Sequence, residues 1–254
     1  MQDWNHKEIA VAHSKGGVIV TAHPYDNLIR PDYVSWPPSE IIQKLYQSRH
    51  AEAFAGPDKQ VSSSGLGYYC DLQSIHSEDA ITWSVFGTVA RGTIPVITDW
   101  LAEFFRLLDL RNALTNSPEI FLWRRLPHPD TLVSGGPEID AGILTENAVI
   151  LVEAKWQSGI GSKQGKMKDK NQIQLRCEFL TKYGSRFFPN RNELAVVGIS
   201  LASEAFVNTT PSGITFRSAT WEQVCGLDFH PQAEELGRYF RWKKEHTKML
   251  KNAN

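Results

Sequence analysis

The stretch from residue 136 to residue 156 constrains the fold of this chain most, because its residues fall into two β-patterned runs around a polar turn. Residues 139–144 form the first run and residues 148–156 the second, and the turn-forming residues 145–147 separate them. The second run is apolar on both faces near its start, as is typical of a strand in the centre of a sheet. The sequence therefore predicts a β-hairpin whose second strand is buried.

Three ionisable side chains are predicted to meet on this hairpin. If residues 146–147 are the two central residues of the turn, Asp140 lies directly opposite Glu153. Side chains alternate between the faces of a strand, so Lys155 shares a face with Glu153 and Ala154 points the other way. A slip of one residue would reverse every face, so this convergence depends on the register of the turn.

Like charges directly opposite each other destabilise an antiparallel pair of strands. A divalent cation bound by Asp140 and Glu153 would offset that cost, and carboxylate oxygens are the ligands that Mg²⁺ or Mn²⁺ favours. The residues of the hairpin therefore predict a metal site.

Asp140, followed on the next strand by Glu153, Ala154 and Lys155, resembles the signature of the PD-(D/E)xK nuclease superfamily, which has the restriction-endonuclease-like fold. Residues 137–140, Pro-Glu-Ile-Asp, resemble the first half of that signature. The resemblance implies an α/β fold with a core in the order α-β-β-β-α-β, in which helices flank a central mixed sheet, and helical extensions at both ends. It also implies metal-dependent hydrolysis of phosphodiester bonds in DNA, with Lys155 stabilising the transition state.

Glu78 is a further candidate ligand from an earlier part of the chain. Ser77 is a typical N-cap, and the helix predicted over residues 77–89 carries Glu78 on its apolar stripe. In the resembled family a glutamate of this first helix often joins the metal site, which implies that Glu78 assists the two hairpin carboxylates and the carbonyl of Ala154. The alternative is that Glu78 only complements the helix dipole.

A helix predicted over residues 169–183 carries Gln172 and Gln174 on opposite sides of its buried row. Many members of the resembled family place a glutamine on this helix, near the metal or the DNA backbone. Helical spacing leaves open which of the two glutamines faces the site.

The segment that follows the hairpin is rich in basic residues. A glycine-containing loop carries four lysines, Lys163, Lys166, Lys168 and Lys170. Clustered ammonium groups on a flexible backbone suit contacts with DNA phosphates, although a solvated loop is the alternative. The net charge of the whole chain is −1, so any affinity for nucleic acid has to be local.

Three segments are expected along the chain: an N-terminal extension over residues 1–73, a nuclease core over residues 74–204 and a C-terminal extension over residues 205–254. The first extension contains a helix predicted over residues 38–55. The second contains a basic, aromatic helix predicted over residues 231–250, which either packs on the core or contacts nucleic acid.

Composition narrows the setting of the protein. Its three cysteines are widely spaced and odd in number, which favours a reducing cytoplasm and argues against a zinc site. The sequence has neither a long apolar run nor a signal peptide, so we expect no membrane span. To cut both strands of DNA, the protein would have to act as a homodimer or bind the DNA twice. A partner protein of a defence system is also a possible binding partner.

Two alternatives compete with a DNA endonuclease of a restriction or phage-defence type. The first is a module on the same fold that binds nucleic acid or a partner without catalysis. The second is a serine hydrolase, because residues 198–202, Gly-Ile-Ser-Leu-Ala, resemble a nucleophile elbow that lacks its closing glycine. A serine hydrolase also needs one later acid and one later histidine, and the candidates are Asp228, Glu234, Glu235, His230 and His246.

Overall fold

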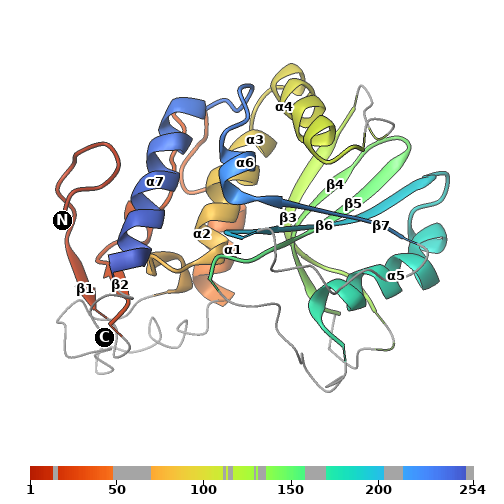
Figure 1. Cartoon of the computed structure of the whole chain (residues 1–254), viewed down its shortest axis with the longest axis horizontal. Helices are drawn as coiled ribbons and strands as arrows, with labels where there is room; N and C mark the ends of the chain where they lie inside the picture. The colour runs from red at the N-terminus through yellow and green to blue at the C-terminus, as the bar shows by residue number, and fades with distance from the viewer. Residues whose placement is uncertain are drawn as a thin grey trace. The chain divides into compact units, whose positions relative to one another are not determined.

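The computed structural model of the protein describes residues 1–13, 17–47, 70–110, 113, 117–128, 130, 136–157, 170–202 and 214–249 (Figure 1). The chain divides into two compact units. Unit 1 comprises Met1–Thr88 and Gln232–Asn254, and unit 2 comprises Val89–Pro231. The two units therefore meet in sequence at 88/89 and 231/232, whereas the sequence led us to expect boundaries at 73/74 and 204/205.

Unit 2 contains a mixed five-stranded sheet in the order β3-β4-β5-β6-β7. The strands β3–β4 and β4–β5 pair antiparallel, whereas β5–β6 and β6–β7 pair parallel. Unit 2 is therefore an α/β unit, with β5 in the middle of the sheet. The strands are β3 (Glu119–Arg125), β4 (Glu138–Leu144), β5 (Ala148–Ala154), β6 (Glu193–Ser200) and β7 (Thr215–Thr220).

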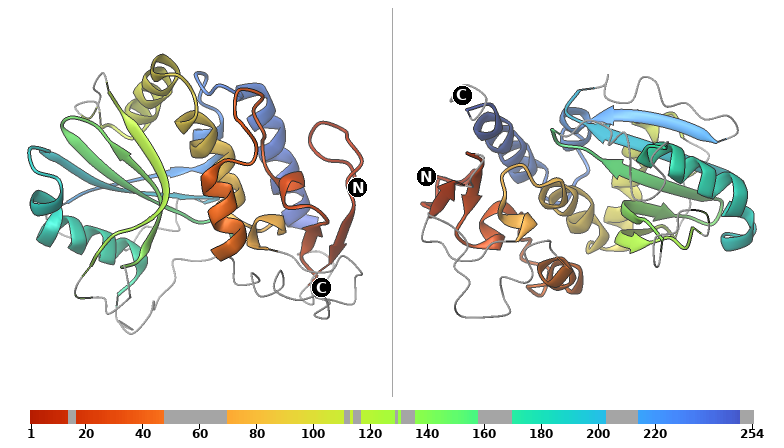
Figure 2. Two further views of the ribbon diagram at one scale, coloured as in Figure 1. Left: turned by 180° about the vertical axis from the view of Figure 1, so that it is seen from behind. Right: turned by 90° about the horizontal axis from the view of Figure 1, so that it is seen from below.

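Helices cover both faces of this sheet. Helix α4 (Ile94–Leu107) lies on one side and helix α5 (Gln172–Phe187) on the other (Figures 1 and 2). Helix α5 connects β5 to the parallel strand β6, and the short helix α6 (Trp221–Cys225) follows β7. Buried residues of α5 pack with Val149, Leu151 and Val196 of the sheet in one apolar cluster. Each large side chain buried there contributes about 1.5–3 kcal/mol.

The β4–β5 hairpin has the predicted register. The strands pair Gly142 with Leu151 and Leu144 with Val149, and the amide of Thr145 donates to the carbonyl of Ala148 at 3.0 Å. Residues 146–147 are therefore the two central residues of the turn. All seven residues of β5 are buried, which confirms the prediction of a central strand.

Unit 1 is built from both ends of the chain. Its strands β1 (Val11–His13) and β2 (Ile19–Thr21) form an antiparallel pair that the sequence pattern did not predict. The helical elements of unit 1 are η1 (Pro24–Asn27), α1 (Ser39–Gln47), η3 (Asp71–Gln73), α2 (Glu78–Thr82), the π-helical turn η4 (Trp83–Gly87) and α7 (Ala233–Met249); α3 (Thr88–Ala90) lies at the boundary of the two units.

Three predicted helices can be compared with unit 1. Ser77 caps α2 as predicted, because its Oγ accepts a hydrogen bond from the amide of Ala80 at 3.1 Å. Helix α1 covers the first part of the helix predicted over residues 38–55, and the rest of that prediction lies outside the described residues. The aromatic side chains of α7 are buried, so the packed alternative is confirmed for them. Within the described part of the chain, none of the helices combines the length and apolar character needed to cross a membrane.

Candidate active site on the β4–β5 hairpin

The hairpin brings Asp140 and Glu153 to the same end of strands β4 and β5. Continuing the observed register by one residue places Asp140 opposite Glu153. Asp140 is half-buried, and its Oδ2 accepts a hydrogen bond from the amide of Ala154 at 2.7 Å. The orientation of the Asp140 carboxylate is therefore fixed by the backbone of the neighbouring strand.

Glu153 is completely buried, and each of its carboxylate oxygens contacts a cation. The Nζ of Lys155 lies 3.0 Å from Oε1, and the Nη2 of Arg176 lies 3.2 Å from Oε2. The side chains of Lys155 and Arg176 are 7% and 2% exposed. Each partner therefore replaces a hydrogen bond that the Glu153 carboxylate loses when it is removed from water.

The backbone of Lys155 is held on both sides just beyond the end of β5. Its amide donates to the carbonyl of Ile199 at 2.7 Å, which extends the pairing with β6 by one residue. Its carbonyl accepts a hydrogen bond from Nε1 of the buried Trp221 at 2.8 Å. With its backbone fixed in this way, the side chain of Lys155 reaches back along the strand to Glu153.

Arg176 belongs to the site although our sequence analysis did not identify it. Its Nη2 donates to the carbonyl of Glu138 at 2.5 Å as well as to Glu153. Arg176 follows Ile173 by three residues and precedes Leu180 by four, so it lies on the buried row of α5. A cation on an otherwise apolar helix face requires a buried acidic partner. That signal was present in the sequence.

The charges of this cluster balance without a metal ion. Two carboxylates, Asp140 and Glu153, lie with two cations, Lys155 and Arg176. Lys155 and Arg176 therefore provide positive charge beside the opposing carboxylates, and the divalent cation that the sequence offered as the simplest source of such charge stays a prediction.

The donor atoms nevertheless fit a hard divalent cation in type. Mg²⁺ usually binds one or two protein carboxylates and keeps several waters, and Asp140 and Glu153 supply such oxygens. Among the residues that the structure describes, no group of three or more His, Cys, Asp or Glu side chains is placed to hold a metal. Any ion at the hairpin would thus depend on these two carboxylates, the carbonyl of Ala154 and water.

Glu78 lies in unit 1, at the start of α2, and is half-buried. In the same unit its negative charge acts on Lys243 of α7, a completely buried lysine whose Nζ donates to the carbonyl of Ile75 at 2.5 Å. Glu78 therefore has an electrostatic role within its own unit. Its participation in a metal site stays a prediction.

The two candidate glutamines differ in what their side chains do. Gln174 forms a capping box with Asn171, in which each side chain accepts a hydrogen bond of 2.9 Å from the other's amide. These two hydrogen bonds hold the side chain of Gln174 at the N-terminus of α5. Gln172, the first residue of α5, is half-buried and takes no part in that box. Of the two, Gln172 is the better candidate for a contact with substrate.

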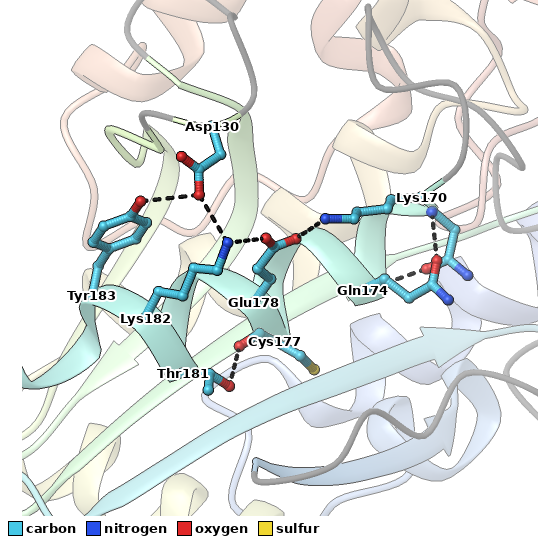
Figure 3. Close-up of polar contacts among 9 residues, drawn as sticks. Asp130, Lys170, Gln174, Cys177, Glu178, Thr181, Lys182 and Tyr183 are labelled. Atoms are coloured by element: carbon cyan, nitrogen blue, oxygen red, sulfur yellow. Dashed lines mark hydrogen bonds and ion pairs between the residues drawn. The ribbon is translucent and has the colours of Figure 1, made fainter.

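Of the four lysines predicted to contact DNA, Lys170 is the one whose surroundings are described. Its Nζ lies 2.5 Å from Glu178, which also binds Lys182 (Figure 3). Lys182 in turn contacts Asp130, whose carboxylate accepts a hydrogen bond from the hydroxyl of Tyr183 (Figure 3). The charge of Lys170 is thus partly neutralised. The other three, Lys163, Lys166 and Lys168, lie outside the described residues.

The serine hydrolase alternative gains no support from the surroundings of Ser200. This residue ends β6, and its hydroxyl donates to the carbonyl of Ala202 at 2.6 Å. The ring of His230 lies 6.3 Å from Trp100 and is buried. Both residues therefore have ordinary structural surroundings.

Comparisons of the chain with protein-family models, with curated proteins and with solved structures found no match. Functional inference therefore starts from the geometry of the hairpin and its four charged side chains.

Proposed function

We propose that the protein is a Mg²⁺- or Mn²⁺-dependent nuclease of the PD-(D/E)xK type that hydrolyses phosphodiester bonds in DNA. The observation that supports this most is the meeting of Asp140, Glu153 and Lys155 at the end of a buried β-hairpin. An antiparallel meander followed by a helix and a parallel strand is compatible with a restriction-endonuclease-like core. A restriction or phage-defence role is the setting that we propose for this activity.

The roles of the residues follow from their surroundings. A divalent cation held by Asp140 and Glu153 would polarise the scissile phosphate and lower the pKa of a bound water. Asp140 is oriented for this by the amide of Ala154. Lys155 would stabilise the negative charge that develops on the phosphoryl group, and its largely buried position strengthens such an interaction.

The first test is cleavage of plasmid DNA in the presence of Mg²⁺. We expect Glu153→Gln and Lys155→Met each to lower the cleavage rate by about 10²-fold or more, because each removes a group that acts on the transition state. Lys182→Met is the matched control, since Lys182 is a lysine of unit 2 on the exposed side of α5. Parent-like cleavage by either Glu153→Gln or Lys155→Met would show that the assigned roles are wrong.

A second candidate function is a module that binds DNA or a partner protein without catalysis. It is favoured by the pairing of both Glu153 oxygens with cations, which gives a balanced cluster that needs no metal. Titration calorimetry with Mn²⁺ separates the two functions. A nuclease takes up Mn²⁺ and loses this uptake in Glu153→Gln, whereas a binding module gives no heat in either protein.

A further inference from the structure

Unit 1 contains a pocket that the proposed nuclease chemistry does not use. Its volume is about 200 Å³, which is below the about 300–1,000 Å³ of pockets that bind drug-sized ligands. Its lining comes from a turn at residues 3–7, from residues 25–30 and from Glu235 of α7, all of which belong to unit 1. A pocket of this size suits a small molecule.

The N-terminal wall of the pocket is a turn that its own hydrogen bonds hold in shape. Oδ1 of Asp3 accepts hydrogen bonds from the amide of Asn5 at 2.8 Å and from the amide of Lys7 at 2.9 Å. The amide of Asp3 donates to the carbonyl of Lys7 at 2.9 Å. These bonds use one oxygen of the Asp3 carboxylate, and its Oδ2 has no hydrogen-bond partner among the described residues.

Glu235 lines the pocket from α7 and also uses a single oxygen for its hydrogen bonds. Its Oε1 accepts hydrogen bonds of 2.9 Å from Nε1 of Trp4 and from Nδ2 of Asn5. Asn5 is held in turn by Arg238, whose Nη2 donates to Oδ1 of Asn5 at 3.1 Å. Glu235 is half-buried, and no described residue contacts its Oε2 through a hydrogen bond or an ion pair.

Two cations line the same pocket without neutralising these two carboxylates. The Nζ of Lys7 lies 4.0 Å from Oδ1 of Asp26, at the outer limit of an ion pair, and the side chain of Lys7 is 62% exposed. Arg30 is exposed and forms no hydrogen bond or ion pair with the other residues that the structure describes. Burial raises the pKa of Tyr25, and the charge of Arg30 partly opposes this shift, so the guanidinium lies near that phenol.

Charged groups of both signs therefore line one small pocket and leave much of their hydrogen-bonding capacity unused. Water can satisfy such groups, and so can a ligand that carries both charges. An ammonium group would donate to the unpaired oxygens of Asp3 and Glu235, and a carboxylate would accept a charge-assisted pair of bonds from Arg30. Trp4 and Leu28 add apolar surface for a short aliphatic side chain.

We propose that this pocket binds a small aliphatic α-amino acid, with its ammonium group against Asp3 and Glu235 and its carboxylate against Arg30. This site goes beyond the proposed nuclease function and does not depend on it. The pocket lining has three acids and two cations, so a ligand that is only an anion would be repelled.

The experiment is calorimetric titration of L-alanine, L-valine and L-leucine into the full chain. We expect at least one of them to bind. The amine that lacks its carboxylate and the carboxylic acid that lacks its ammonium group should each bind about tenfold more weakly or not at all. These two compounds measure separately what the acids and Arg30 contribute.

Two substitutions test the two halves of the pocket. Glu235→Gln keeps an oxygen for Trp4 and Asn5 but replaces the unpaired oxygen by an amide nitrogen, so the amino acid should bind about tenfold more weakly. Arg30→Met should weaken the amino acid by a similar factor and leave binding of the matching amine unchanged. The controls are Glu234→Gln and Arg241→Met, because both residues are exposed on α7 and neither lines the pocket.

The proposal is wrong if the parent binds none of the three amino acids, or if Glu235→Gln and Arg30→Met both bind them like the parent. It is also wrong if the amine binds as tightly as the amino acid, because the pocket would then recognise a cation alone. Thermal unfolding checks that each variant is folded, and should Glu235→Gln fail this check, the exposed Arg30→Met decides. None of these outcomes bears on the nuclease proposal, whose residues belong to unit 2.

Discussion

Buried ionisable side chains occur in both units of this protein. Glu153 of unit 2 contacts Lys155 and Arg176, and Lys243 of unit 1 donates to the carbonyl of Ile75 and is affected by the charge of Glu78. A group whose pKa differs between the folded and the unfolded chain makes stability depend on pH. Lys243 is such a group, because burial lowers its pKa.

Lys243 should make unit 1 more stable as the pH rises above neutrality. Burial lowers its pKa to about 7, and Glu78 opposes this shift. In the unfolded chain a lysine keeps a pKa of about 10.4, so above pH 7 the unfolded state binds the additional proton and stability increases with pH. We expect Lys243 to contribute a gain of about 1.7 kcal/mol between pH 7 and pH 8.5, measured by urea unfolding as the difference between the parent and a variant without this amine.

The variant Lys243→Met isolates this effect. It replaces a buried amine by an apolar side chain of similar length, so its stability should be higher than that of the parent at pH 7 and the difference should shrink as the pH rises. The buried cysteines lower the stability of both proteins as the pH approaches the unfolded thiol pKa of about 8.5, because burial raises the pKa of Cys70 to about 11 and that of Cys177 to about 12, and the difference between the two proteins cancels this contribution. A constant difference across the range of pH in which Lys243 titrates would contradict the assignment.

Single residues also show where sequence reasoning succeeded and where it did not. Asp140, Glu153 and Lys155 were found because they lie within one hairpin, where a short turn fixes which residues meet. Arg176 reaches Glu153 from 23 residues away, and no local pattern specifies that contact. The position of Arg176 on the buried row of α5 indicates that it has an acidic partner, but it does not identify Glu153 as that partner.

At the level of elements, the hairpin depends on a glycine that admits a neighbouring aromatic ring. Gly142 lies opposite Phe121 of β3, and a Cβ at this position would lie 2.1 Å from Cζ of that ring. Phe121 is buried in the apolar cluster beneath α5. The ring therefore lies directly on the backbone of β4, two residues from Asp140.

Gly142→Ala should accordingly destabilise unit 2. The added methyl group forces Phe121 or the strand to move, and overpacking of this kind costs about 1–3 kcal/mol. Urea unfolding should show the loss, and the second substitution Phe121→Leu should recover part of it by making room. Additive losses in the double variant would indicate that the ring is not the cause.

The elements of the sheet could be predicted to the extent that their patterns are local. The apolar runs of the sequence predict strands over residues 119–125 and 193–199, which are β3 with its observed ends and β6 within one residue. The three-residue strands β1 and β2 are too short to show an alternating pattern. The sequence also predicts a short strand near residues 214–217, which corresponds to β7, but the pairing of β7 with β6 is a long-range contact that the residues of β7 do not reveal.

At the level of the whole molecule, residues from the two ends of the chain form one unit. The ring of Trp4 lies 4.8 Å from that of Tyr239 and 5.2 Å from that of Trp242. The Nε1 of Trp242 also donates to the carbonyl of Gln2 at 2.9 Å. The sequence suggested separate extensions, because contacts across more than 230 residues leave no periodic signal in either segment.

Trp242 is therefore expected to be important for the stability of unit 1. Trp242→Ala removes a buried ring and a hydrogen bond, and such truncations cost about 3–5 kcal/mol. Trp242→Phe keeps an aromatic ring and should lose only about 1 kcal/mol for the hydrogen bond. Both losses can be measured by urea unfolding followed by circular dichroism. Equal losses would mean that the hydrogen bond, and not the ring, holds α7.

The chain leaves unit 1 after Thr88 and returns to it at Gln232, so unit 2 is an insertion within unit 1. If Met1 and Met249 were pulled apart, the force would act first on the contacts between the N-terminal and C-terminal segments of unit 1. The sheet would remain mechanically shielded until those contacts rupture. A single molecule stretched in this way should therefore extend in a fixed sequence, with the strands of the sheet unravelling last.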